Sequence, residues 1–247
     1  MSLENKKPLI VGFDGIHRSG KGTQAEMLHN AITTAGGRSV IMRGDGTRDG
    51  LGLHDGDPYS AEWQARSKSV KSPEGSTVEA WNAAALVLAR ELDDRLKSET
   101  DPYDALILDR TLVSRAGFLL HRGVGIKGTR FTLDEMYPDN EKLSYTAQIS
   151  LQDTVPDIIF DLHAPSPRKM LDRLDPEDPK YLFRSRNIKG GYDSAMIAAQ
   201  HLPVEIETKV VTLDALDHPD RVHYQVISRL ATTALSAILS EKRKTQR

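Results

Sequence analysis

The sequence predicts an α/β protein built on an open, parallel, five-stranded sheet with helices on both faces. Short apolar runs recur along the chain, segments with helical spacing follow several of them, and a glycine-rich loop joins the first run to the first helix. Apolar runs of this length are typical of strands that are buried on both faces. Strands that alternate with helices favour a parallel sheet.

The predicted elements follow one another in a simple order. The first strand covers 9–13, and the first helix follows it, with Ala25, Leu28 and Ile32 on one face. Further strands are expected at 39–42, 105–108, 157–160 and 210–213, and further helices at 76–97, 165–173 and 219–240. The loop 43–60 is rich in glycine and aspartate, and so long a loop is usually functional or mobile. We expect one domain over 1–247 with loop insertions near 43–75 and 122–150.

A phosphate-binding loop is predicted between the first strand and the first helix. Gly15, Gly20 and Lys21 fit the P-loop pattern Gly-x-x-x-x-Gly-Lys in its proper strand–loop–helix context. Backbone N–H groups, the helix N-terminus and the lysine ammonium together bind phosphate oxygens in such a loop. The alternative is a plain glycine-rich turn with a surface lysine. Gly22 stands where Ser or Thr usually ligates Mg²⁺, and the hydroxyl comes one residue later, on Thr23.

Composition and charge fit a soluble globular protein. The 247 residues are 38% hydrophobic and 28% charged, and a net charge of −2 gives no electrostatic reason to expect nucleic acid as the main partner. The lack of cysteine excludes a disulfide framework, a thiolate zinc site and a cysteine nucleophile. The sequence shows no signal-peptide pattern and no run of transmembrane length, so we expect a cytoplasmic protein without a membrane partner.

A second candidate site follows the third strand. Asp109 and Arg110 come directly after the run 105–108, so we expect them at the C-terminal edge of the sheet, where ligands of such sheets bind. Asp109 can hold Mg²⁺ through a water molecule, and the planar guanidinium of Arg110 suits phosphate oxygens. The alternative is a structural ion pair, and the P-loop elsewhere in the chain favours the functional interpretation.

These motifs resemble the thymidylate kinase family of nucleoside monophosphate kinases. The family pattern Phe-Glu-Gly-x-Asp-[Gly/Arg]-x-Gly-Lys-[Ser/Thr]-Thr-Gln is similar to the segment from Phe13 to Gln24, and Asp-Arg-[Tyr/Phe]-x-x-Ser is similar to the segment from Asp109 to Ser114. Segments 156–162, 188–192 and 210–215 are similar to three further family motifs in the right order. The resemblance spans most of the chain. It implies a P-loop NTPase fold, ATP and Mg²⁺ as cofactors, a lid at 174–190 and a homodimer.

The resemblance implies a role for each matched residue. Lys21 would bind the ATP phosphates, Arg18 would stabilise the transferring phosphoryl group, and Arg110 would orient the acceptor phosphate. Asp109 would support the metal, and Thr23 is a second candidate for it. The implied ATP-binding set is Gly15, Ser19, Gly20, Lys21, Gly22 and Thr23, with Arg184, Arg186 and Lys189 in the lid. The implied acceptor-binding set is His17, Arg43, Arg90, Arg110 and Ser114. Each lid residue has the alternative of a solvated basic side chain. Converging arginines are expected because phosphoryl transfer depends mainly on positioning and positive charge.

The departures from the family pattern gather on the acceptor side. His17 stands where the family has an Asp that contacts the acceptor sugar, and Leu86 aligns with the Phe that stacks on thymine. Phe118-Leu119 replaces a Tyr-Gln pair, and Gly44-Asp45 replaces a Glu-Pro pair. Loss of the stacking and polar contacts should weaken recognition of the thymine base.

Three functions therefore stay open at this point. The first is an ATP-dependent kinase of the thymidylate kinase type, acting on dTMP or a related nucleoside monophosphate. The second is a phosphotransferase of the same fold that acts on a nucleoside or another small acceptor. The third is a nucleotide-binding regulatory protein with weak catalysis. The presence of Lys21, Arg18 and Arg110 together favours the two enzymes, because binding alone does not require the arginines.

Overall fold

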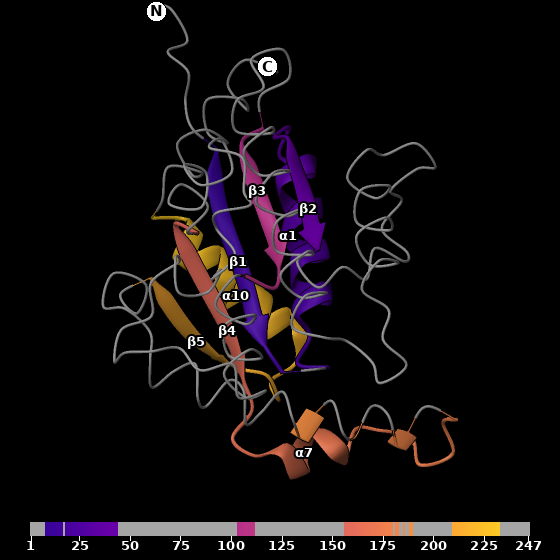
Figure 1. The fold of residues 1–247 in the computed structure, drawn as a ribbon. Helices are drawn as coiled ribbons and strands as arrows, with labels where there is room; N and C mark the ends of the chain where they lie inside the picture. Colours follow the sequence, from indigo (N-terminus) through magenta and orange to yellow (C-terminus); the bar gives the residue numbers. More distant parts are fainter. Residues whose placement is uncertain are drawn as a thin grey trace, which may run out of the picture.

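Five parallel strands form one sheet in the computed structural model of the chain. The strands are β1 (Leu9–Gly15), β2 (Ser39–Arg43), β3 (Ala105–Asp109), β4 (Ile158–His163) and β5 (Val210–Asp214), in the spatial order β2-β3-β1-β4-β5 (Figure 1). The structure describes residues 8–16, 18–43, 103–111, 156–179, 181–182, 185, 188–189 and 209–232. The predicted fold class is confirmed, and the central position of β1 places its loop between the ends of β3 and β4.

The inner strands form because apolar side chains fill both of their faces. Ile10, Val11 and Phe13 of β1 are fully buried, as are all four apolar residues of β3. Val11 lies in register with Ile107 of β3 and with Ile158 of β4. All the strands run in the same direction, so their C-terminal ends meet at one edge of the sheet, which lies low in Figure 1.

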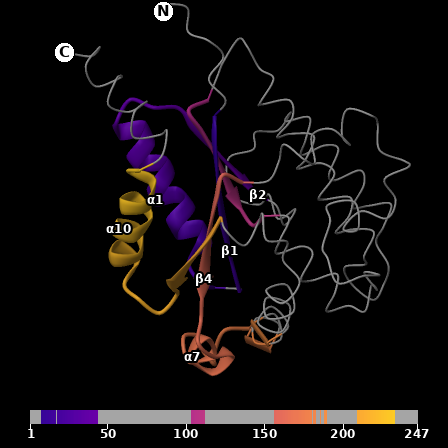
Figure 2. The same cartoon turned by 90° about the vertical axis from the view of Figure 1, so that its left-hand side faces the viewer.

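Two helices lie side by side against one face of the sheet. Figure 2 shows α1 (Lys21–Thr34) and α10 (Pro219–Leu230) together on that face. The buried residues Ala25, Leu28 and Ile32 of α1 have the helical spacing that the sequence predicted. Together with Val222 and Val226 of α10, they pack against Phe13 and other strand residues in one apolar core. No helix in the described ranges is both long and apolar enough to cross a membrane.

Several predicted element bounds need correction. β1 runs two residues past the predicted 9–13, and β2, β3 and β5 each run one residue past their predicted ends. The strand predicted at 157–160 begins at Ile158 and runs on to His163, because its second half alternates polar and apolar residues instead of continuing the apolar run. The helix predicted at 165–173 is shorter, α7 (Pro167–Leu171), since the extended residue Ser166 precedes it. The helix predicted to end at 240 gives way to a turn at 231–232 after Leu230. The predicted loop 43–60 and helix 76–97 lie outside the described residues, except for Arg43.

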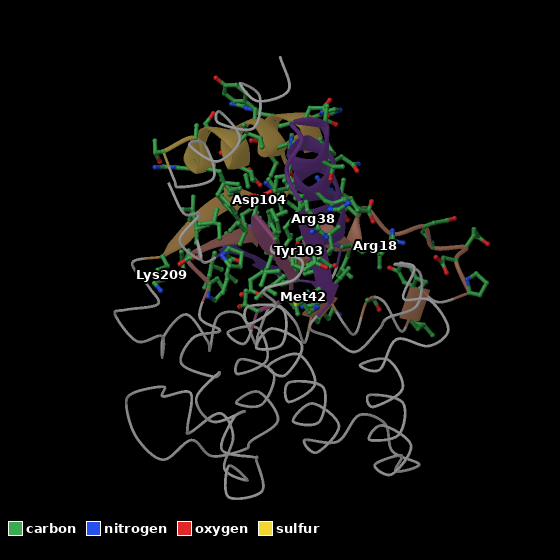
Figure 3. All side chains as sticks on the ribbon, turned by 90° about the horizontal axis from the view of Figure 1, so that it is seen from above. Arg18, Arg38, Met42, Tyr103, Asp104 and Lys209 are labelled. Atoms are coloured by element: carbon green, nitrogen blue, oxygen red, sulfur yellow. The ribbon has the colours of Figure 1, made fainter. Side chains whose placement is uncertain are left out.

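Polar contacts hold the strands together at the opposite, N-terminal edge of the sheet. The carboxylate of Asp104 accepts a hydrogen bond of 2.6 Å from the backbone N–H of Arg38, and the guanidinium of Arg38 lies 5.3 Å from the centre of the Tyr103 ring. Figure 3 shows these three residues close together. Asp157, just before β4, accepts a bond of 2.8 Å from the backbone N–H of Ile10. These contacts align β2, β3, β1 and β4, and so align the opposite ends that carry the site.

Candidate phosphate-binding site

The loop between β1 and α1 turns sharply at two glycines. Gly15 has φ 131° and Gly20 has φ 96°, and residues other than glycine rarely adopt such backbone angles. A Cβ atom on Gly15 would lie 2.5 Å from the backbone oxygen of Leu162 and 2.8 Å from Oγ of Ser19. The start of the loop therefore packs directly against the backbone of β4. The shape of the loop requires glycine at both of these positions.

The N-terminus of α1 has no side-chain cap among the described residues, and its first turn contains no acidic residue. The other long helix differs, because the ring of His218 accepts a bond from the N–H of Asp220 at the start of α10, and Asp220 is itself acidic. The first N–H groups of a helix require acceptors from outside the helix, and they favour anions. The start of α1 therefore suits a phosphate group.

The side chain of Lys21 lies inside the loop. It is 6% exposed, and its Nζ donates hydrogen bonds of 2.7 Å to the carbonyl of Ile16 and 3.3 Å to Oγ of Ser19. Ser19 is itself buried. The loop therefore holds the Lys21 ammonium group in place. Because the group is already ordered, placing it beside a phosphate oxygen would cost less entropy.

Two arginines near the loop have left-handed backbone conformations. Arg18 has φ 63° and Arg110 has φ 77°, and these are the only non-glycine residues with positive φ in the described part of the chain. Such conformations cost free energy and concentrate at functional sites. Arg18 is exposed on the loop. Arg110 is only 8% exposed, and its Nη1 lies 3.4 Å from the carbonyl oxygen of Gly15.

Asp109 approaches the start of α1 from the end of β3. Its Oδ2 would lie 3.4 Å from a Cβ atom on Gly22, an ordinary contact distance, so the carboxylate lies beside the first turn of α1. The backbone of Arg43, the last residue of β2, is the register partner of Asp109. The predicted pair Asp109–Arg110 and the end of β2 thus lie at the same edge of the sheet as the loop.

These residues fit a magnesium ion only in part. Asp109 supplies one carboxylate beside the loop, whereas the hydroxyl of Thr23 belongs to an exposed residue one position beyond the usual site. No group of three or more His, Asp or Glu side chains suited to a metal ion occurs among the residues that the structure describes. One carboxylate with water and phosphate oxygens is the usual environment of Mg²⁺ in phosphoryl-transfer sites. The described residues therefore supply one ligand for such a metal, whose other ligands would come from water and from a bound phosphate group.

Several predicted site residues lie outside the described part of the chain. They are His17, Arg90, Ser114, Arg184 and Arg186, together with the side chain of Arg43. The departures at Leu86, Phe118, Leu119, Gly44 and Asp45 also lie there. Lys189 is described and exposed, and its neighbour Ile188 is buried in the core that contains α1 and α10.

The sequence interpretation gave no role to three polar residues under the loop. Both carboxylate oxygens of Asp14 accept hydrogen bonds from Thr111: Oδ1 from the backbone N–H at 2.9 Å, and Oδ2 from the hydroxyl. Thr111 is fully buried and follows Arg110, so it connects the end of β1 with the Asp109–Arg110 turn. The third residue, Asp161 of β4, is the register partner of Asp14. A charged residue inside an apolar strand, as in Ile-Ile-Phe-Asp-Leu, was the available signal for Asp161.

Asp161 has an unusual protonation equilibrium. Burial and then the nearby carboxylate of Asp14 raise the pKa of Asp161 to about 6, while His163 and Lys21 act in the opposite direction. Raised carboxyl pKa values of this kind gather at functional sites. The loop therefore lies above a carboxyl group that changes charge close to neutral pH.

Comparison with solved structures supports the fold of this site. The thymidylate kinase from Candida albicans, a protein of broad substrate specificity, matches with a TM-score of 0.54 and 16% sequence identity, over 92% of this chain and 92% of that one. No protein-family model matches the chain, and no curated protein matches it. The chain thus shares the α/β, P-loop-like fold of that structure, and at this identity the likeness concerns the fold alone.

Proposed function

We propose that the chain is an ATP-dependent phosphotransferase that moves the γ-phosphoryl group of ATP to a nucleoside monophosphate. The main support is the convergence of two buried cations on one loop, Lys21 from the start of α1 and Arg110 from the end of β3. Phosphate binding alone needs the loop and its lysine. A second buried cation, held against the first glycine of that loop, suits an enzyme that must neutralise charge on a transferring group.

Each residue of the site takes a role in this proposal. The loop from Gly15 to Thr23 binds the ATP phosphates together with Lys21, and Asp109 holds Mg²⁺ through water. Arg18 stabilises the transferring group, and Arg110 orients the acceptor phosphate. Arg43, Arg90, His17 and Ser114 complete the acceptor site, while Arg184 and Arg186 act from a lid at 174–190 of a single domain. The proposal also includes a cytoplasmic homodimer with a small nucleotide as its substrate.

We expect the acceptor to carry a phosphate group. We also expect dTMP to be a poor substrate. Leu86 and His17 stand where the related kinases stack on thymine and hold the sugar, whereas the arginines that bind phosphate are present. Aromatic stacking contributes roughly 0.5–1.5 kcal/mol beyond area burial. Because the polar groups that would bind the base and the sugar are replaced as well, kcat/KM for dTMP should fall below about 10⁴ M⁻¹s⁻¹, the lower end for efficient enzymes.

A panel of nucleoside monophosphates and nucleosides, each incubated with Mg-ATP and followed by ADP release, tests this proposal. At least one monophosphate should give faster turnover than dTMP, and the unphosphorylated nucleosides should give none. Turnover with nucleosides alone would mean that a hydroxyl group is the acceptor. ATP binding without ADP release for any acceptor would contradict the enzymatic proposal and favour a nucleotide-binding regulator.

A further inference from the structure

Two carboxyl groups lie next to each other under the phosphate loop. Asp14 is the last residue but one of β1, and Asp161 is its register partner on β4. Neighbouring strands lie about 4.8 Å apart, and register partners point to the same face of a sheet. The preceding pair, Phe13 and Phe160, stacks on the face of α1 with ring centres 5.5 Å apart. Asp14 and Asp161 therefore share the opposite face of the sheet.

The two carboxyl groups have different surroundings. Thr111 donates hydrogen bonds to both oxygens of Asp14, which is 5% exposed. Asp161 is partly buried and faces charge on several sides: Asp14 from β1, Lys21 from the start of α1 and His163 from its own strand. Its register partner on β5, Thr212, is uncharged. These are the charged and titratable groups that act on Asp161 within the described ranges.

The position of Asp161 connects it to the loop. Leu162, the next residue, has its backbone oxygen against Gly15, the first glycine of the loop. The field of Lys21 also reaches Asp161, because the Lys21 ammonium lowers the pKa of this carboxyl while burial and Asp14 raise it to about 6. An anion bound in the loop would add negative charge close to Asp161 and would favour its neutral form.

We propose that Asp161 is a positioning residue of the phosphate site that takes up a proton when a polyphosphate fills the loop, so that nucleotide affinity falls as the pH rises through neutrality. In the free protein the Lys21 ammonium stabilises the charged form of Asp161. A phosphate group bound to the lysine would offset that positive charge, so a charged Asp161 beneath the loop becomes unfavourable, and a proton neutralises it. Proton binding and phosphate binding then strengthen each other by the same factor. This inference rests on the proposed nucleotide-binding function of the loop.

The test is the dissociation constant of ADP, measured by calorimetry between pH 5.5 and pH 8.5 without magnesium. The variants are the wild type, Asp161→Asn and a matched control, Asp172→Asn, which removes an exposed carboxylate after α7. Protons that ADP itself gains or loses are common to all three and cancel in the ratios. Asp161→Asn imitates the neutral form at every pH. It should bind ADP as the wild type does at pH 5.5, and about tenfold more tightly at pH 8.5 if the bound phosphate shifts the pKa by one unit.

A second measurement follows the proton directly. At pH 7.5, the wild type should take up a fraction of a proton more than Asp161→Asn for each ADP bound, read from the heats in two buffers of different ionisation enthalpy; the protons of ADP itself cancel in this difference. If ADP binds but the ratio of wild type to Asp161→Asn stays constant with pH, or if the two chains take up the same number of protons, this inference is wrong and the phosphate site stands. If ADP binds to none of the three chains at any pH, the proposed function itself fails.

Discussion

Arg18 combines a strained backbone with a side chain that nothing buries. Its φ of 63° lies in the left-handed region, and the residue is exposed on the phosphate loop. For a residue other than glycine, this backbone conformation costs roughly 1–3 kcal/mol of folding free energy, and such strain is found mainly at functional sites. We therefore expect the Arg18 side chain to act beside a ligand, so that its loss should appear in turnover more than in stability.

Substitution of Arg18 tests this separation. Arg18→Ala should lower kcat by about 10²-fold with little change in ATP affinity, because the guanidinium acts on the charge of the transition state. Arg18→Gly should lose the same activity, while its free energy of unfolding stays equal or rises by up to about 1 kcal/mol as the backbone strain is relieved. Steady-state kinetics and chemical denaturation give the two values. A normal kcat in either variant would show that Arg18 is a surface loop residue without a part in catalysis.

At the scale of elements, the contact between β1 and β4 carries an electrostatic cost. Asp14 and Asp161 are register partners, and burial with the charge of Asp14 raises the pKa of Asp161 from 3.8 to about 6. An acid whose pKa is higher in the folded state binds more protons folded than unfolded between these two values. The stability contributed by its protonated form is therefore lost as the pH rises from about 4 through about 6.

Asp161→Asn should consequently stabilise the free protein at neutral pH and leave it unchanged in acid. At pH 7 the gain in the free energy of unfolding should be about 1–3 kcal/mol, since each pKa unit corresponds to about 1.4 kcal/mol. Near pH 3.5, where Asp161 is mostly neutral in both states, the two chains should unfold nearly alike. Urea denaturation at both pH values, with Asp172→Asn as the control for a lost surface charge, provides the measurement. A gain that is equal at both pH values would show that Asp161 acts through packing or hydrogen bonding instead of charge.

At the scale of the whole molecule, the parts that could be predicted from the sequence are those with a local signal. Most of β1 and β3 is a continuous apolar run, and the loop from Gly15 to Lys21 has fixed spacing, so the element types and the turn at the two glycines could be predicted. The second half of β4 could not, because Asp161 and His163 break the apolar run while Leu162 still packs in the core. The strand bounds differ from those predicted mainly where polar residues end a strand at the site.

The long-range contacts lacked such a signal. Thr111 binds Asp14 across 97 positions, and Asp161 meets Asp14 only because β4 lies beside β1. Residue spacing within one segment says nothing of which strands become neighbours, and the order β2-β3-β1-β4-β5 is set by packing of the whole sheet. The polar residues beneath the loop therefore became visible only once the strands were in register.

If the loop from Gly15 to Lys21 binds a nucleoside triphosphate, ATP binding should depend on Lys21, and equilibrium binding of ATP to Lys21→Ala measures that dependence. The matched control is Lys169→Ala, which removes an exposed lysine from α7. Hydrogen bonds to a charged group contribute about 1.5–3 kcal/mol, so Lys21→Ala should bind ATP about 10- to 100-fold more weakly, with its fold intact by circular dichroism. The control should bind as the wild type does. A folded Lys21→Ala chain that binds ATP within twofold of the wild type would contradict the account.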